Sequence, residues 1–176
     1  GFRKDYIEAM KELKITNMRW PGGNYVMAYN WQDGIGPKEK RPAMLNVHWG
    51  RVTEDNSFGT HEFLDYAEKL GTQPYICANL GTGTWTEAQQ WVEYCNSSAD
   101  TETTRLRKQN GRQQPWKVTY WGLGNEMDGP WQIGRKTAEL SLTPAIVAQD
   151  GFLTTHLIEP MMVPEKELVA EFLGDA

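Results

Sequence analysis

Apolar positions along the chain recur first at helical spacing and then in short continuous runs. Residues 2–13 place apolar side chains three and four positions apart, which predicts an amphipathic helix. A second helical pattern begins at Thr60, a good cap residue, and stops at Gly71, a residue suited to a helix end. A third follows Thr84 and Glu87, whose spacing is typical of a capping box. Three helices are therefore expected.

Short strand patterns separate these helices. Residues 16–20, 74–80 and 118–123 are candidates, and the run 74–80 is continuously apolar, as expected for a strand covered on both faces. Strands that alternate with helices indicate βα units and a parallel sheet. A complete (β/α)8 barrel takes ~250 residues. We therefore expect an α/β fold of about three βα units, an incomplete (β/α)8 (TIM) barrel if the units belong to one.

Two connecting segments are long. Residues 21–42 carry Tyr25, Tyr29 and Trp31, and a loop of this length inside a compact domain is usually functional. Residues 97–115 are polar and are interpreted as a loop. Four basic residues within that segment are expected to form a solvated face: Arg105, Arg107, Lys108 and Arg112.

Composition narrows the function classes. The net charge of -5 argues against a nucleic-acid partner, and no apolar run approaches the ~18 residues of a membrane span. The eight Trp residues suit sugar faces, although Trp is equally a large core residue. No cofactor is implied, and the three histidines are too scattered to predict a metal site: His48, His61 and His156.

The two cysteines, Cys77 and Cys95, fall in segments expected to be buried and cannot form a disulfide framework. Reduced thiols in a cytoplasmic protein are the simpler interpretation. The chain begins at Gly1, without an initiator Met, so a lost signal peptide and secretion stay open.

The strongest chemical candidate is the pair Asn125 and Glu126, which follows the third predicted strand. In a parallel α/β architecture, ligands bind at the carboxyl ends of the strands. A glutamic acid there, beside an amide that can bond a sugar hydroxyl, suits general acid catalysis on a glycosidic oxygen. An ordinary salt bridge at the rim of a loop is the alternative.

Four motifs, in this order, resemble the α-L-arabinofuranosidases of glycoside hydrolase family 51. They are R-W-P-G-G-N at residues 19–24, Y-N-W-Q-D-G-I-G-P at 29–37, N-L-G-T-G at 79–83 and W-G-L-G-N-E-M-D-G-P-W-Q at 121–132. The resemblance covers about residues 1–139. It implies a (β/α)8 barrel that releases terminal arabinofuranose from hemicellulose such as arabinoxylan or arabinan, with retention.

The same resemblance implies roles for individual residues. Glu126 matches the acid/base, and Asn125 matches the residue that bonds the sugar 2-hydroxyl. Arg19 and Asn24 match contacts near the sugar. The loops that carry Trp31 and Trp131 are expected to face the substrate pocket.

One residue that the family needs, the second carboxylate, has no match in this chain. A retaining glycosidase needs a second carboxylate about 5 to 5.5 Å from the first, and in this family it lies on a later strand. Asp128, two residues from Glu126, is a poor substitute. The chain is therefore expected to carry the acid/base half of the site and to be weakly active or inactive alone. An unpaired sheet edge would favour self-association.

Two other functions stay open. A xylanase or endoglucanase of the same barrel clan would favour an open groove over a pocket. A non-catalytic sugar-binding fragment would bind without turnover.

Residues 140–176 depart from the family pattern. Thr143 and Pro144 interrupt a helix. Residues 144–156 and 159–165 are similar to the α-chain of pyruvate:ferredoxin oxidoreductases. We interpret this segment as a foreign or a divergent tail. An oxidoreductase function would depend on it alone, and it carries neither a thiamine diphosphate site nor cluster cysteines.

Overall fold

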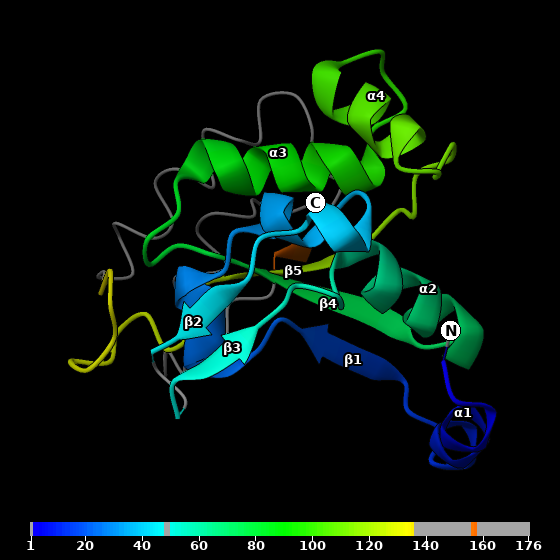
Figure 1. Ribbon diagram of the computed structural model, residues 1–176, viewed down its shortest axis with the longest axis horizontal. Helices are drawn as coiled ribbons and strands as arrows, with labels where there is room; N and C mark the ends of the chain where they lie inside the picture. The colour runs from blue at the N-terminus through cyan, green and yellow to red at the C-terminus, as the bar shows by residue number, and fades with distance from the viewer. Residues whose placement is uncertain (1, 48–49, 136–155, 158–176) are drawn as a thin grey trace, which may run out of the picture.

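The computed structural model describes residues 2–47, 50–135 and 156–157, which form a parallel sheet with helices on one face (Figure 1). Each strand of the sheet is parallel to its neighbours. The strands, in spatial order, are β1 (Asn17–Trp20), β4 (Gln73–Ala78), β5 (Tyr120–Leu123) and β6 (His156–Leu157). Their carboxyl ends point the same way, toward the left of Figure 1.

Helices α2 (Thr60–Leu70) and α3 (Trp85–Asn96) cover the same face of this sheet. The indole of Trp91 in α3 contacts Trp20 of β1 and Trp121 of β5 edge to face, at centroid distances of 6.1 and 5.9 Å. Phe63 of α2 stacks on Trp20 at 5.3 Å. Burial of these aromatic rings contributes to the apolar contact between the layers.

The helix predictions hold with one shift. Helix α1 (Lys4–Glu12) and helix α3, with its Thr84 cap, form as expected, and α2 ends at Gly71 in the left-handed conformation (φ 71°). Thr60, however, is not the cap of α2. Gly59 takes that place and donates its N–H to Glu62, while the buried Thr60 hydroxyl accepts a hydrogen bond from Trp91.

The polar segment 97–115 is not all loop, as the sequence analysis expected. It contains helix α4 (Glu102–Gln109), whose cap residue Thr101 accepts a hydrogen bond from the Thr104 N–H. Arg107, expected in a solvated face, is 0% exposed and donates two hydrogen bonds of 2.8 Å to the carbonyls of Tyr94 and Ser97. The apolar pattern missed this helix because a buried guanidinium, not an apolar stripe, attaches it to α3.

The long connection after β1 is also more ordered than expected. Residues 21–42 include three 3-10 helices, η1 (Gly23–Ala28), η2 (Trp31–Gly34) and η3 (Lys38–Lys40). An antiparallel hairpin that the sequence analysis did not predict follows, formed by β2 (Met44–Asn46) and β3 (Val52–Glu54).

A buried ion pair closes the base of this hairpin. The Arg41 side chain is 3% exposed and binds both carboxylate oxygens of Glu62, at 3.0 and 3.1 Å. It also donates to the carbonyls of Gly36 and Asn56. Since residues 41 and 56 flank the hairpin, this one guanidinium fixes both of its ends to α2.

The expected fold class is therefore confirmed in part. The α/β sheet, with each described βα helix on one face, matches the expectation, and both cysteines are free and buried. The helix break at Thr143 and Pro144 and most of the proposed tail lie outside the described residues. Within the described part, no helix is long and apolar enough to cross a bilayer.

The contacts of Arg107 lead to the first testable prediction. Arg107→Ala leaves buried carbonyls without donors, so the free energy of unfolding should fall by about 2 to 4 kcal/mol. Arg105→Ala is the matched control, since Arg105 lies on the same helix in an exposed ion pair with Asp100 and should cost no more than ~0.5 kcal/mol. Urea unfolding of the two variants measures both values. Equal losses would contradict the structural role of Arg107.

Candidate functional site

Parallel pairing brings residues from distant parts of the sequence to one edge of the sheet. Asn24 follows β1, Asn79 follows β4, and Asn125 with Glu126 follows β5. Because β4 pairs in parallel with both β1 and β5, the loops after these strands meet at the carboxyl edge. The sequence analysis placed Asn125 and Glu126 at a strand end, and the structure agrees.

A chain of hydrogen bonds connects four side chains at this edge. Arg19 Nη2 donates to Asn125 Oδ1 at 3.3 Å, and Asn125 Nδ2 donates to Asn24 Oδ1 at 3.2 Å. Gln132 Nε2 donates to the same Asn24 oxygen at 3.0 Å. The structure thus brings together three of the predicted site residues, and it adds Gln132. Only its place at the end of the fourth motif, in W-Q, could have drawn attention to Gln132.

Glu126 is exposed beside this group and has a strained backbone. Its φ of 50° lies in the left-handed region, where a residue with a Cβ is destabilised by about 1 kcal/mol or more. The strain is held by a tight turn in which the Gly129 N–H donates to the Glu126 carbonyl at 2.9 Å. Strained residues of this kind cluster at functional sites.

Trp131 lies over the turn and contacts the Glu126 side chain. Its indole Nε1 donates to Glu126 Oε2 at 3.0 Å, while 69% of the residue is exposed. The ring occupies the space that a Cβ at Gly129 would need, 2.7 Å from Trp131 Cε2. Trp131 therefore both orients one carboxylate oxygen and presents an open aromatic surface.

The loop after β4 contacts the loops after β1 and β5. The Asn79 side chain accepts hydrogen bonds from the backbone N–H groups of Gly81, Thr82 and Gly83 and donates to the Tyr29 carbonyl at 3.1 Å. Gly81 and Gly134 approach each other so closely that a Cβ at Gly134 would lie 2.6 Å from the Gly81 Cα. The loops after β1, β4 and β5 are thus packed backbone to backbone.

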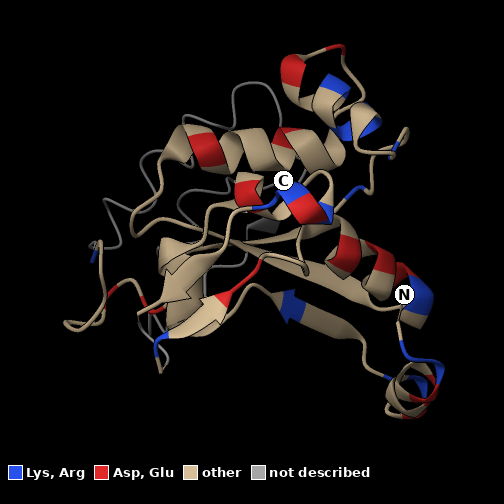
Figure 2. Cartoon of the chain, viewed as in Figure 1, with Lys and Arg blue, Asp and Glu red and all other residues tan. Residues whose placement is uncertain are grey.

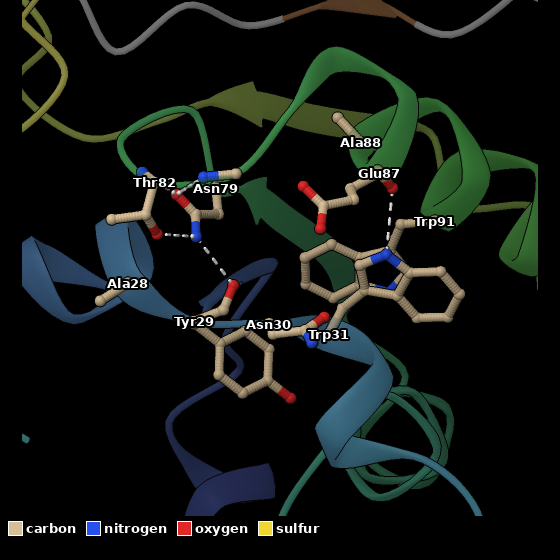
Figure 3. Close-up of a pocket in the computed structure, with 10 residues that line it drawn as sticks. Ala28, Tyr29, Asn30, Trp31, Asn79, Thr82, Glu87, Ala88 and Trp91 are labelled. Carbon is tan, nitrogen blue, oxygen red and sulfur yellow. Dashed lines mark hydrogen bonds between the residues drawn. The ribbon is translucent and has the colours of Figure 1, made fainter. Parts of the chain in front are cut away.

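Trp31 is not part of the hydrogen-bonded group. It is 3% exposed, stacks on Trp91 at 6.0 Å and donates its indole N–H to the Glu87 carbonyl. Together with Asn79 it lines a cavity of about 100 Å³ beside α3 (Figure 3). The structure places Trp31 in the core, where it anchors the loop after β1, and not as an open surface for a sugar ring.

Charge is sparse on the sheet face opposite the helices. Arg19 is the only charged residue in β1, β4 and β5, and Figure 2 shows these strands otherwise without charge. Tyr75 and Cys77 share that face in the strand register. Burial raises the pKa of Tyr75 to about 12 and that of Cys77 to about 11, so both stay neutral near neutral pH. The Cys77 thiol is therefore poorly suited to act as a nucleophile.

The arrangement can bind a ligand rich in hydroxyl groups. Both lone pairs of Asn24 Oδ1 accept hydrogen bonds, while its amide nitrogen makes none to the described residues. The Arg19 guanidinium and this amide present N–H donors beside an exposed carboxylate. Among the described residues, no group of three or more His, Cys, Asp or Glu side chains is placed to hold a metal ion.

Comparison with known proteins finds similarity to α-L-arabinofuranosidases. Residues 9–133 match the family described as "Alpha-L-arabinofuranosidase 1 domain". The chain is 57% identical over 139 residues to "Probable alpha-L-arabinofuranosidase C" of Aspergillus niger, covering 79% of this chain and 27% of that protein. It is 51% identical over 129 residues to the "Intracellular exo-alpha-L-arabinofuranosidase" of Bacteroides ovatus, covering 73% of this chain and 25% of that protein. The chain thus spans about a quarter of the length of these relatives.

Solved structures show the same similarity. The α-L-arabinofuranosidase of Thermotoga maritima in its arabinose complex matches with a TM-score of 0.82 and 45% identity, over 90% of this chain and 34% of that one. The thermostable GH51 α-L-arabinofuranosidase of Thermotoga petrophila matches with a TM-score of 0.84, also at 45% identity, over the same shares of the two chains.

The backbone of Glu126 leads to the second prediction. Glu126→Gly removes the Cβ from a left-handed position, so the free energy of unfolding should rise by ~0.5 to 1 kcal/mol. Asp128→Gly, an exposed neighbour whose φ is not positive, should instead lower it by a similar amount. Thermal and urea unfolding of both variants test this difference in sign. A loss of stability in Glu126→Gly would contradict the prediction that relief of the backbone strain outweighs the lost side-chain contact with Trp131.

Proposed function

Because the chain belongs to the α-L-arabinofuranosidases of glycoside hydrolase family 51, we propose that it forms the proton-donating half of their active site. In this proposal, the complete enzyme releases terminal α-L-arabinofuranosyl residues from hemicellulose such as arabinoxylan or arabinan, with retention. The observation that carries the proposal is Glu126, an exposed carboxylate at a strand end beside four hydrogen-bonded polar side chains.

Substrate binding follows from the donors at the edge of the sheet. Arg19 and the Asn24 amide direct N–H groups toward the place where a ligand would sit beside Glu126, and the hydroxyl oxygens of a furanose can accept them. Asn125 keeps one amide hydrogen after its bond to Asn24, and that hydrogen can reach the sugar 2-hydroxyl. The arabinose complex of the Thermotoga maritima relative supports this substrate class.

Glu126 then acts in both steps of a double displacement. In the first, the protonated carboxyl donates its proton to the glycosidic oxygen as a nucleophilic carboxylate attacks the anomeric carbon. In the second, the Glu126 carboxylate takes a proton from water, whose oxygen attacks the anomeric carbon and releases the enzyme carboxylate. Trp131 Nε1 holds one oxygen of Glu126, which leaves the other oriented for proton transfer.

The second carboxylate is assigned to another part of the enzyme. Retention requires it about 5 to 5.5 Å from Glu126, and the family resemblance places it on a later strand. In the same proposal, the strands continue into a closed (β/α)8 barrel, with the face of Arg19, Tyr75 and Cys77 turned inward. The relative named as intracellular favours a cytoplasmic enzyme.

The role of Glu126 can be tested in a full-length enzyme. The 139 matched residues of the Aspergillus niger relative are replaced by those of this chain. In this graft, Glu126→Gln should slow hydrolysis of substrates with poor leaving groups by roughly 10² to 10⁴-fold. Activated aryl α-L-arabinofuranosides, whose leaving groups need little protonation, should lose less in the glycosylation step, and azide should restore turnover of the intermediate with Glu126→Ala.

Controls separate this role from its alternatives. Asp128→Asn should keep most of the activity of the graft. Preference for an aryl glucoside over the arabinofuranoside would favour a xylanase or endoglucanase, and binding without turnover would favour a sugar-binding role. Equal losses in Glu126→Gln on both substrate types, without azide rescue, would remove Glu126 from the acid/base role.

The 176-residue chain alone gives a further prediction. Its turnover of an aryl α-L-arabinofuranoside should not exceed that of Glu126→Gln prepared in the same way, since retention needs two carboxylates. Robust turnover that the substitution abolishes would place the second carboxylate within this sequence, at Asp128 or Asp33. The comparison uses the purified chains side by side.

A further inference from the structure

We propose that Gln132 is a positioning residue that decides which end of the Asn24 amide faces the sugar, an inference that rests on the function proposed above. Gln132 is 6% exposed, although its neighbour Trp131 is open to solvent. Its Nε2 donates to Asn24 Oδ1 at 3.0 Å and also to the backbone carbonyl of Asn125. It touches both the loop after β1 and the loop after β5.

The Asn24 amide has only one orientation that satisfies its neighbours. Its oxygen accepts from Gln132 Nε2 and from Asn125 Nδ2, which uses both lone pairs. Rotation by half a turn would place the Asn24 NH₂ group against two other donors and break both hydrogen bonds. The NH₂ group is therefore directed away from Gln132, where it can donate to a sugar hydroxyl oxygen.

Gln132 is itself held by the turn that carries Glu126. Its backbone N–H donates to the Gly129 carbonyl at 3.0 Å, and its carbonyl accepts from the Arg135 N–H at 3.3 Å. Within this turn, Trp131 is exposed and Gln132 is buried. The same turn thus sets the acid/base carboxylate and, through Gln132, the donor that binds the sugar.

Asn125 alone would fix Asn24 less firmly. Without Gln132, the Asn24 oxygen keeps one donor, so the amide can rotate and present its oxygen to the ligand. Two oxygens that face each other repel unless a hydroxyl hydrogen lies between them. We expect weaker binding of the arabinosyl group in both the ground state and the transition state, seen as a raised KM with a smaller change in kcat.

A double-mutant cycle in the grafted full-length enzyme tests this role. Gln132→Met keeps the length of the side chain and removes its donor, and it should lower kcat/KM by roughly 10 to 100-fold while Asn24 is present. In the Asn24→Ala background, the same substitution should lower it by less than about threefold, because its partner is gone. Gln132→Glu, which places an acceptor against the Asn24 oxygen, should be at least as harmful as Gln132→Met.

The outcomes are distinguishable from failure of the proposed function. An equal loss of kcat/KM from Gln132→Met in both backgrounds would show that Gln132 serves folding only and would overturn the inference. An unchanged kcat/KM in Asn24→Ala would overturn it as well. Should Gln132→Met fail to fold, the same cycle with Gln132→Glu decides the question. The proposed function is tested separately, by the loss of activity of the grafted enzyme in Glu126→Gln. That variant is not part of the double-mutant cycle.

Discussion

The parallel pairing of β4 with both β1 and β5 is the constraint on which the candidate site depends. It sends three loops to one edge of the sheet, so that Asn24 and Asn125, about a hundred positions apart, can share a hydrogen bond. Helices on one face cover the strands, and the aromatic contacts of Trp20, Trp91 and Trp121 hold those layers together. The opposite face remains available for polar side chains such as Arg19.

Polar side chains help to fix the loops that surround this edge. Asn79 binds three backbone N–H groups of its own loop, Arg41 joins both ends of the hairpin to Glu62, and Gln132 connects the loops after β1 and β5. Apolar burial contributes as well, since Met27 and Trp31 of the loop after β1 are in the core. Each of the polar side chains satisfies several backbone or side-chain partners, which gives a short segment a single conformation.

The residues proposed to carry out the chemistry are placed at a cost in local stability. Glu126 occupies a left-handed backbone position that a glycine would adopt without cost, and Trp131 leaves most of its ring in solvent. The surrounding turn holds both in place through backbone hydrogen bonds. This pattern is expected of a site whose residues are selected for what they bind rather than for how well they pack.

By itself, the sequence determined three helices with apolar faces, the three strands that alternate with them, and the strand-end position of Asn125 and Glu126, because periodicity and caps act over a few residues. It failed where distant partners decide. Arg107 looked like a surface cation but is buried among carbonyls, Trp31 looked like a sugar platform but is a core residue, and Gln132 had no signal beyond its place at the end of the fourth motif. Only the tertiary structure could settle these three, because each depends on groups brought near by the packing of strands and helices and not by neighbours in the chain.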